Sequence, residues 1–179
     1  MSNALPEHID AWRTVAARRT YAGTLPLSAM PRLVGLLADA EGECEFELAF
    51  ERDPFGIAIV DLKAKTRLPL VCQRSLERFE LAVEVKQQLG LISDERDEAS
   101  LPADVEPVLV AEDGMLEPLA LIEDELILAV PVVPVNPAIE AQAPEDGVLW
   151  TSESPEEQAE NDRPAPNPFV ALASLKTKR

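Results

Sequence analysis

The sequence predicts an α+β fold: an antiparallel β-meander with N-terminal helices, a helix in the C-terminal half, and an acidic disordered tail that ends in a short helix. Three observations predict it. Apolar and polar residues alternate with period two across much of residues 42–87, as in half-buried strands. Apolar residues recur at helical spacing in residues 6–19 and 116–130. Residues 138–165 are rich in Pro, Glu, Ala, Ser and Asp, a composition that cannot bury a core.

The N-terminal part is predicted to contain two helices that flank a short strand. Residues 6–19 place Ile9, Trp12 and Val15 on one helical face. Residues 21–27 follow as the strand, and Ser28 is the predicted N-cap of the second helix.

The first hairpin of the meander has a register that follows from parity. Apolar residues occupy even positions on both strands, so directly opposed residues must have an even sum. A three-residue loop, Pro54-Phe55-Gly56, satisfies this condition and suits a type I turn followed by a left-handed glycine. The register predicts these opposed pairs: Phe50 with Val60, Leu48 with Leu62, Glu47 with Lys63, Glu45 with Lys65, and Glu43 with Arg67.

The remaining strands are shorter or less regular. A loop over residues 74–77 would lead into a third strand, with Phe79 on the inner face and Arg67 opposite Glu84. Residues 93–99 read as a polar loop, residues 106–110 as a short fourth strand, and Asp113-Gly114 as a turn.

The C-terminal half divides into three predicted parts. The α+β domain spans residues 1–137 and includes the helix over residues 116–130, which Pro131 ends. Residues 138–165 form the predicted disordered linker. Residues 166–179 form a short helix that Asn167 caps, with Phe169, Leu172 and Leu175 on one face.

Charge is distributed unevenly along the chain. The net charge is −17, and residues 93–165 carry 20 Asp and Glu against Arg96 and Arg163. The rest of the chain is therefore nearly neutral. An acidic surface repels phosphate backbones and attracts basic proteins, although a solvated acidic linker would have the same composition. No apolar run is long enough to span a membrane and no secretory signal opens the chain, so we expect a cytoplasmic protein with reduced cysteines.

The sequence contains no catalytic constellation. His8 is the only histidine and has no nucleophile motif around it, and the glycines form no phosphate-binding loop. Glu123, Asp124 and Glu125 diverge around a helix axis, so they cannot converge on one metal ion. They read as a solvated acidic first turn that complements the helix dipole, or as a patch for a basic partner.

Three phrases together resemble the bacterial YceD family of large ribosomal RNA subunit accumulation proteins. They are the strand end Leu70-Val71-Cys72-Gln73-Arg74-Ser75, the run from Leu121 through the acidic triplet to Val135, and the ending from Asn167 to Lys176. The resemblance covers nearly the whole chain. It implies a role in 23S rRNA accumulation and large-subunit assembly, and it implies no known catalytic activity.

The resemblance also bears on zinc. Family members with a second Cys at the hairpin, and further Cys or His after the proline run, have the ligands of a zinc knuckle. Here Ser75 stands at the second position, and residues 135–137 supply neither Cys nor His. Because a structural zinc needs four N or S ligands, we expect no zinc and no other cofactor.

Two mechanisms remain open for a non-enzymatic ribosome biogenesis factor. In the first, an acidic region contacts a basic ribosomal protein or a large-subunit (50S) assembly intermediate. In the second, the chain binds 23S pre-rRNA directly. Few aromatic residues are present and those placed in strands face the core, so the first is preferred. The candidate partner-binding residues are Glu123, Asp124, Glu125, Phe169, Leu172 and Lys176, and the candidate RNA-binding residues are Arg13, Arg18, Arg19, Lys178 and Arg179.

Overall fold

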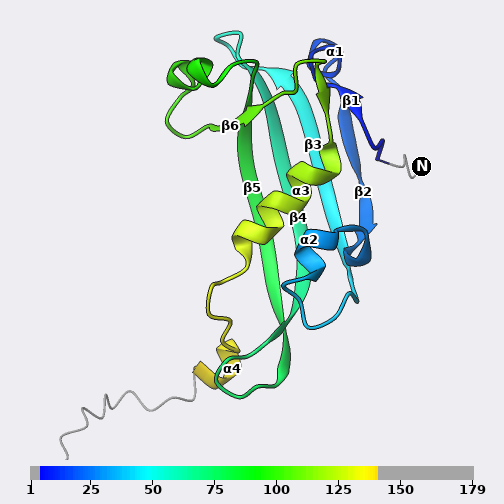
Figure 1. Ribbon diagram of the computed structural model, residues 1–179, viewed down its shortest axis with the longest axis vertical. Coiled ribbons are helices and arrows are strands. Elements are labelled where there is room, and N and C mark those ends of the chain that lie inside the picture. Colours follow the sequence, from blue (N-terminus) through cyan, green and yellow to red (C-terminus); the bar gives the residue numbers. More distant parts are fainter. Residues whose placement is uncertain (1–4, 141–179) are drawn as a thin grey trace, which may run out of the picture. The chain divides into compact units, whose positions relative to one another are not determined.

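A five-stranded sheet with helices on one face makes up the part that the computed structural model describes, residues 5–140 (Figure 1). The strands lie in the order β2 (Thr20–Pro26), β3 (Glu43–Arg52), β4 (Ala58–Val71), β5 (Arg78–Ile92) and β6 (Glu106–Leu109). The first four are antiparallel neighbours, whereas β6 runs parallel to β5. A separate two-stranded ribbon joins β1 (Ile9–Asp10) and β7 (Met115–Leu116). The predicted α+β class and the antiparallel meander are confirmed.

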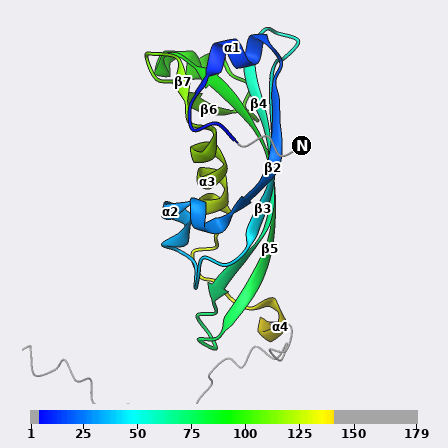
Figure 2. The same ribbon diagram turned by 90° about the vertical axis from the view of Figure 1, so that its right-hand side faces the viewer.

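The helices cover one face of the sheet and leave the other open (Figure 2). They are α1 (Ala11–Ala16), α2 (Pro31–Val34) and α3 (Pro118–Ala129). Between them and the sheet lies the core, in which the rings of Tyr21 and Phe50 meet edge to face at 6.0 Å. The largest fully buried side chains are Phe50, Leu27, Met30, Leu33, Leu48, Leu62, Leu68, Leu70, Leu89, Ile122, Leu126 and Val15. As aliphatic residues dominate this list, burial of Leu, Ile and Val supplies most of the hydrophobic stabilisation.

The β3–β4 hairpin has the predicted register. Phe50 lies opposite Val60, Leu48 opposite Leu62, and Glu47 opposite Lys63. The loop is closed by the hydrogen bond from Asp53 N to Ile57 O at 2.9 Å, and Gly56 has φ +87°, the conformation the turn requires. Both edges of the main sheet carry a proline, Pro26 at the end of β2 and Pro107 within β6.

The β4–β5 hairpin corrects the prediction by two residues. Glu84 lies opposite Lys65, not Arg67, and Cys72 N donates to Glu77 O at 2.9 Å, so the loop consists of residues 73–76. A shift of two preserves which residues face the core, and parity therefore could not detect it. Arg67 instead approaches Glu80 at 3.8 Å.

The N-terminal helices are shorter than predicted. Asp10 is the N-cap of α1 and accepts a hydrogen bond from Arg13 N at 2.9 Å, because Ile9 and Asp10 are already paired in the β1–β7 ribbon. Ser28 is not a helix N-cap. It lies inside a 3₁₀ helix, η1 (Leu27–Ala29), and α2 then begins at Pro31 with Met30 as its N-cap.

The C-terminal half has the expected elements with shifted boundaries. The predicted loop after β5 contains a 3₁₀ helix, η2 (Glu95–Ser100), and the fourth strand and the turn at Gly114 are present. α3 begins two residues later than predicted, and α4 (Pro137–Glu140) covers the first residues of the predicted linker. The division of the chain at residue 137 stays a prediction. No described helix is long and apolar enough to cross a membrane.

Candidate functional site

Glu123 is a structural residue, which corrects the interpretation of the acidic triplet as a solvated first turn. The triplet lies in the middle of α3, and Glu123 is 5% exposed. Its carboxylate accepts hydrogen bonds from Arg32 N at 2.7 Å, Leu33 N at 3.2 Å and Arg32 Nε at 2.8 Å. It therefore satisfies the N-terminal amides of α2 and fixes that short helix to α3.

Asp124 and Glu125 have different surroundings: Asp124 also contacts Arg32 of α2, whereas Glu125 lies near other carboxylates. Asp124 Oδ1 accepts from Arg32 Nη1 at 2.6 Å, so one guanidinium joins both neighbouring carboxylates. The pKa of Arg32 is raised chiefly by its hydrogen bond to Glu123. The pKa of Glu125 is raised by burial first, then by the negative charges of Glu106 and Asp124. Glu125 thus sits among like charges.

A groove between α3 and β5–β6 brings these acids over an apolar floor. Its volume is about 410 Å³. The floor consists of Leu89, Pro107, Val108, Leu121, Ile127 and Leu128, and the rim of Glu106, Asp124 and Glu125. We call it the acidic groove. Leu128 is 69% exposed, so part of the floor is open to a partner.

The three N-terminal arginines gather where α1 ends. Arg18 has φ +47°, and its N–H donates to Val15 O at 3.0 Å while Arg19 N donates to Thr14 O at 3.2 Å. This is a Schellman motif with arginine at the position that usually takes glycine. Arg13, Arg18 and Arg19 are all exposed.

The tip of the β3–β4 hairpin lies at the same end of the molecule as α1 (Figures 1 and 2). Phe55 at this tip is 86% exposed and has no place in the core. Arg52, at the end of β3, directs Nη1 to Gly56 O at 2.6 Å. We call this region, Arg13, Arg18, Arg19, Arg52 and Phe55, the arginine end. Phe55 was predicted to lie in a turn, but its exposure was not predicted. The sequence feature that could have predicted this exposure is an aromatic residue at the centre of a tight Pro-x-Gly turn, a position that points into solvent.

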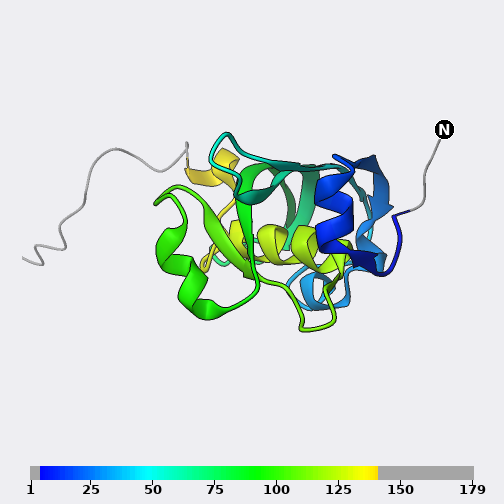
Figure 3. The same ribbon diagram turned by 90° about the horizontal axis from the view of Figure 1, so that it is seen from above.

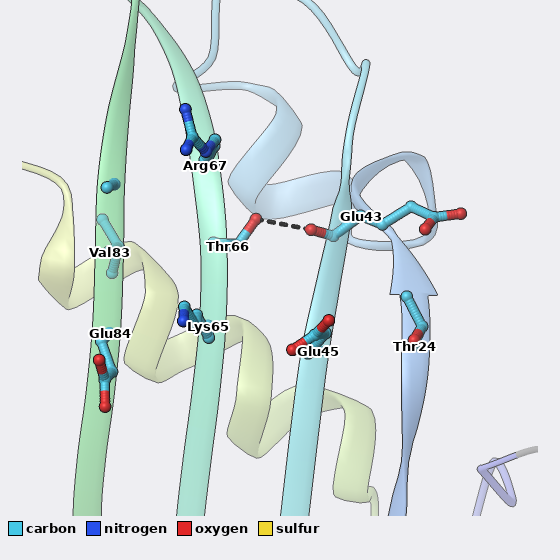
Figure 4. A pocket seen from close by; sticks show the side chains of 9 residues that line it. Thr24, Glu43, Glu45, Lys65, Thr66, Arg67, Val83 and Glu84 are labelled. Atoms are coloured by element: carbon cyan, nitrogen blue, oxygen red, sulfur yellow. Dashed lines mark hydrogen bonds between the residues drawn. The ribbon is translucent and has the colours of Figure 1, made fainter.

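The open face of the sheet carries charges that mostly neutralise one another. Figure 4 shows Glu45, Lys65 and Glu84 side by side on three neighbouring strands. Lys63 Nζ lies 2.8 Å from Glu47 Oε1, and Lys86 Nζ lies 2.6 Å from Glu84 Oε1. A face with this pairing offers a partner little uncompensated charge.

The β4–β5 hairpin is tied to the segment that follows α3. Gln73 N donates to Pro134 O at 2.8 Å, and Cys72 Sγ accepts from Asn136 N at 3.4 Å and Ser75 N at 3.5 Å. These bonds, Asn136 first, lower the pKa of Cys72 to about 7. We call this arrangement the clasp.

No described residues fit a metal centre. The clasp brings one thiol to the place where a zinc knuckle would need several ligands, and among residues 5–140 no three His, Cys, Asp or Glu side chains are grouped to hold a metal ion. Within the same range both cysteines are free, and Cys44 lies opposite Thr66 in the β3–β4 hairpin. Burial raises the pKa of Cys44 to about 11. His8 Nδ1 lies 3.7 Å from Glu117 Oε1. The absence of zinc stays a prediction.

The remaining candidate residues lie outside the described part of the chain. They are Phe169, Leu172, Lys176, Lys178 and Arg179.

Comparison with known proteins decides the family. Residues 60–176 match the model of the family described as large ribosomal RNA subunit accumulation protein YceD. The chain belongs to the YceD family. Over 178 residues it is 30% identical to the "Large ribosomal RNA subunit accumulation protein YceD" of Haemophilus influenzae, with 97% of each chain covered. No solved structure matches. The resemblance drawn from the three sequence phrases is confirmed, and the YceD description concerns accumulation of the large ribosomal RNA subunit and names no catalytic activity.

Proposed function

We propose that this YceD protein is a non-enzymatic ribosome biogenesis factor that acts in the cytoplasm. It supports 23S rRNA accumulation and 50S assembly by holding a basic ribosomal protein or assembly intermediate in the acidic groove. The observation that carries the proposal is the combination of an apolar floor with three clustered carboxylates on its rim. The relative's name, which refers to large ribosomal RNA subunit accumulation, supports the process.

The electrostatics of the groove favour a cationic occupant. The pKa of Glu125 is raised by burial, Glu106 and Asp124, so the carboxylates destabilise one another's charged forms. A lysine or arginine placed between them would relieve that repulsion. The exposed side chain of Leu128 would at the same time cover the aliphatic stem of such a residue.

Glu123 leaves the set of partner-binding residues in this proposal, because its carboxylate is used by α2. Glu106 replaces it. Phe169, Leu172 and Lys176 are proposed to add a second contact with the same partner, through two apolar side chains and one cation.

The test compares two sets of charge changes of equal size. Glu106→Gln, Asp124→Asn and Glu125→Gln are combined in one variant, and Glu41→Gln, Glu43→Gln and Glu45→Gln, all exposed, in the control. Binding to purified basic large-subunit proteins and co-sedimentation with 50S precursors are measured at two salt concentrations. The groove variant should bind about tenfold more weakly, since each exposed pair contributes up to about 1 kcal/mol.

Added salt should weaken wild-type binding, because exposed charges are screened within about 8 Å at physiological ionic strength. Equal loss in the groove variant and the control would show that general acidity, not the groove, attracts the partner. Unchanged binding in both would contradict the proposal.

A further inference from the structure

We propose that the arginine end binds an unpaired segment of RNA, with Phe55 stacked on a base and Arg18, Arg19 and Arg52 on the phosphates. This inference goes beyond the proposed function. It rests on that function in one respect, the choice of ribosomal RNA as the anionic ligand. It concerns a different surface from the acidic groove. The chain would then contact protein and RNA at separate sites.

Phe55 is held in the open by a rigid turn. Asp53 Oδ1 accepts from Phe55 N at 2.9 Å and from Ile57 N at 2.7 Å, and Gly56 N donates to Asp53 O at 3.0 Å. These bonds fix the backbone around a ring that is 86% exposed. Proteins that bind single-stranded RNA present aromatic rings on which bases stack, and a fixed ring loses little conformational entropy when it does so.

Arg19 and Arg52 lie near the strand ends that lead into the turn of Phe55, and both are exposed. Arg19 O accepts from Phe50 N at 2.9 Å, which places Arg19 against the end of β3, and Arg52 follows two residues further along that strand. Among residues 5–140, no salt bridge involves Arg18, Arg19 or Arg52. This contrasts with Arg32, which holds two carboxylates. Arg52 Nη1 bonds the Gly56 carbonyl, but none of the three guanidinium groups has a carboxylate partner, and such groups are suited to phosphate.

Glu51, next to Arg52 on β3, is exposed, whereas three other acids of this end are engaged by the backbone. Asp10 accepts from Arg13 N at 2.9 Å, Asp53 caps its own turn, and Asp113 accepts from Met115 N at 2.9 Å. The three carboxylates are thereby held to the turns and caps that they stabilise. The net charge of −17 is concentrated elsewhere along the chain, and screening over about 8 Å limits its reach.

Arg18 carries backbone strain that the fold alone does not require. Its φ of +47° is a conformation that favours glycine, and a glycine would complete the Schellman motif at lower energy. Arg18→Gly therefore removes the side chain without removing a backbone conformation that the fold needs.

The opposite hairpin offers matched controls. Its tip holds Arg74 and Leu76, which are exposed like Arg52 and Phe55, but leucine has no aromatic face on which a base can stack. The two tips differ in chemistry and not in accessibility. A general effect of surface charge or of exposed apolar area would affect both equally.

The experiment measures binding of the full chain to a labelled single-stranded 23S rRNA fragment by fluorescence anisotropy. Phe55→Ala should weaken binding about fivefold or more, and Phe55→Trp should restore it, because base stacking tolerates any aromatic ring. Arg19→Gln with Arg52→Gln should lower the slope of log K against log salt by about 1.4. Arg18→Gly should raise Tm and weaken binding. Leu76→Ala and Arg74→Gln should leave binding unchanged.

Several results would overturn the inference. They are the lack of wild-type binding, equal effects of Phe55→Ala and Leu76→Ala, or Phe55-dependent binding to phosphatidylserine vesicles without binding to RNA. The groove variant separates the two proposals, since it should retain RNA binding while Phe55→Ala retains binding of basic protein. If RNA binding fails and the protein contact survives, only this inference falls. If RNA binding is observed and binding of basic protein is not, only the proposed function is contradicted.

Discussion

The arginine end and the clasp lie at opposite ends of the same sheet, and they use their polar groups in opposite ways (Figure 1). At the clasp, Cys72 and Gln73 find partners on Pro134 and Asn136, about sixty residues away in sequence. The α2–α3 junction beside it behaves similarly, because Arg32 bonds Glu123 across 91 residues. At the arginine end, the Arg52 side chain bonds the carbonyl of Gly56, within its own hairpin.

The difference separates charge that holds the fold together from charge that the fold leaves available. Arg32 and Arg19 are the same residue type and both are exposed, but only Arg32 has its guanidinium shared between two carboxylates. Glu123 and Glu125 differ in the same way, although only one residue separates them on α3. The carboxylate of Glu123 accepts hydrogen bonds from α2, whereas Glu125 lines the acidic groove. Composition counts all of these residues alike, so it cannot say which of them a partner could use.

Glu123→Ala should be the most damaging single change in this comparison. It removes three hydrogen bonds and leaves two backbone N–H groups of α2 without their acceptor. We expect a loss of about 3 kcal/mol in the free energy of unfolding, measured by urea titration. Asp124→Ala is the control, and it should cost no more than about 1 kcal/mol because that pair is half exposed. Similar losses of stability in the two variants would show that the buried carboxylate of Glu123 does not stabilise the fold more than the exposed carboxylate of Asp124 does.

The clasp should make stability depend on pH, with a smaller effect. The folded pKa of Cys72 is about 7, below the ordinary thiol value of 9.0, so between these values the unfolded chain binds more protons. Stability should therefore rise from pH 7 to pH 9, and this contribution should be lost as pH falls through 7. Above pH 9 the raised pKa of Cys44, about 11, should reverse the trend.

Cys72→Ser tests this origin. The variant should lose the rise between pH 7 and pH 9 and keep the fall above pH 9, as measured by urea unfolding at a series of pH values. Thiolate absorbance at 240 nm should show a matching titration in the wild type only. A rise that persists in Cys72→Ser would mean that another group titrates in this window.

The smallest expected effect concerns the left-handed residue at each end. Arg18 has φ +47° and Leu76 has φ +61°, so glycine at either position should raise the free energy of unfolding by about 1 kcal/mol. Thermal melts of Arg18→Gly and Leu76→Gly should show similar gains. Only Arg18→Gly should also weaken RNA binding. A gain in stability at one end alone would show that the two backbones are not strained alike.

Local patterns predicted the first hairpin, and long-range contacts decided what the sequence missed. Pro54 and Gly56 define one turn, and parity left one register for Phe50 and Val60. At the second hairpin, Glu84 could pair with Arg67 or with Lys65 without changing the core face, so charge could not choose between registers two residues apart.

The sites show the same limit. The burial of Glu123 depends on α2, which is 90 residues away, and a run of three acids contains no trace of it. Phe55 was within reach of the sequence, because a residue at the centre of a three-residue loop points into solvent. Arg18 and Arg19 were named as candidates, but their place at the same end of the sheet as Arg52 follows from the pairing of β2 with β3.

The two edge prolines have a consequence for self-association. A sheet grows from molecule to molecule when an edge strand presents an unbroken row of N–H and C=O groups to its copy. β6 has four residues and one of them is Pro107, while Pro26 closes the free edge of β2. Each edge therefore lacks a donor where a neighbouring strand would need one. Both edges of the sheet are thus protected against polymerisation through the backbone.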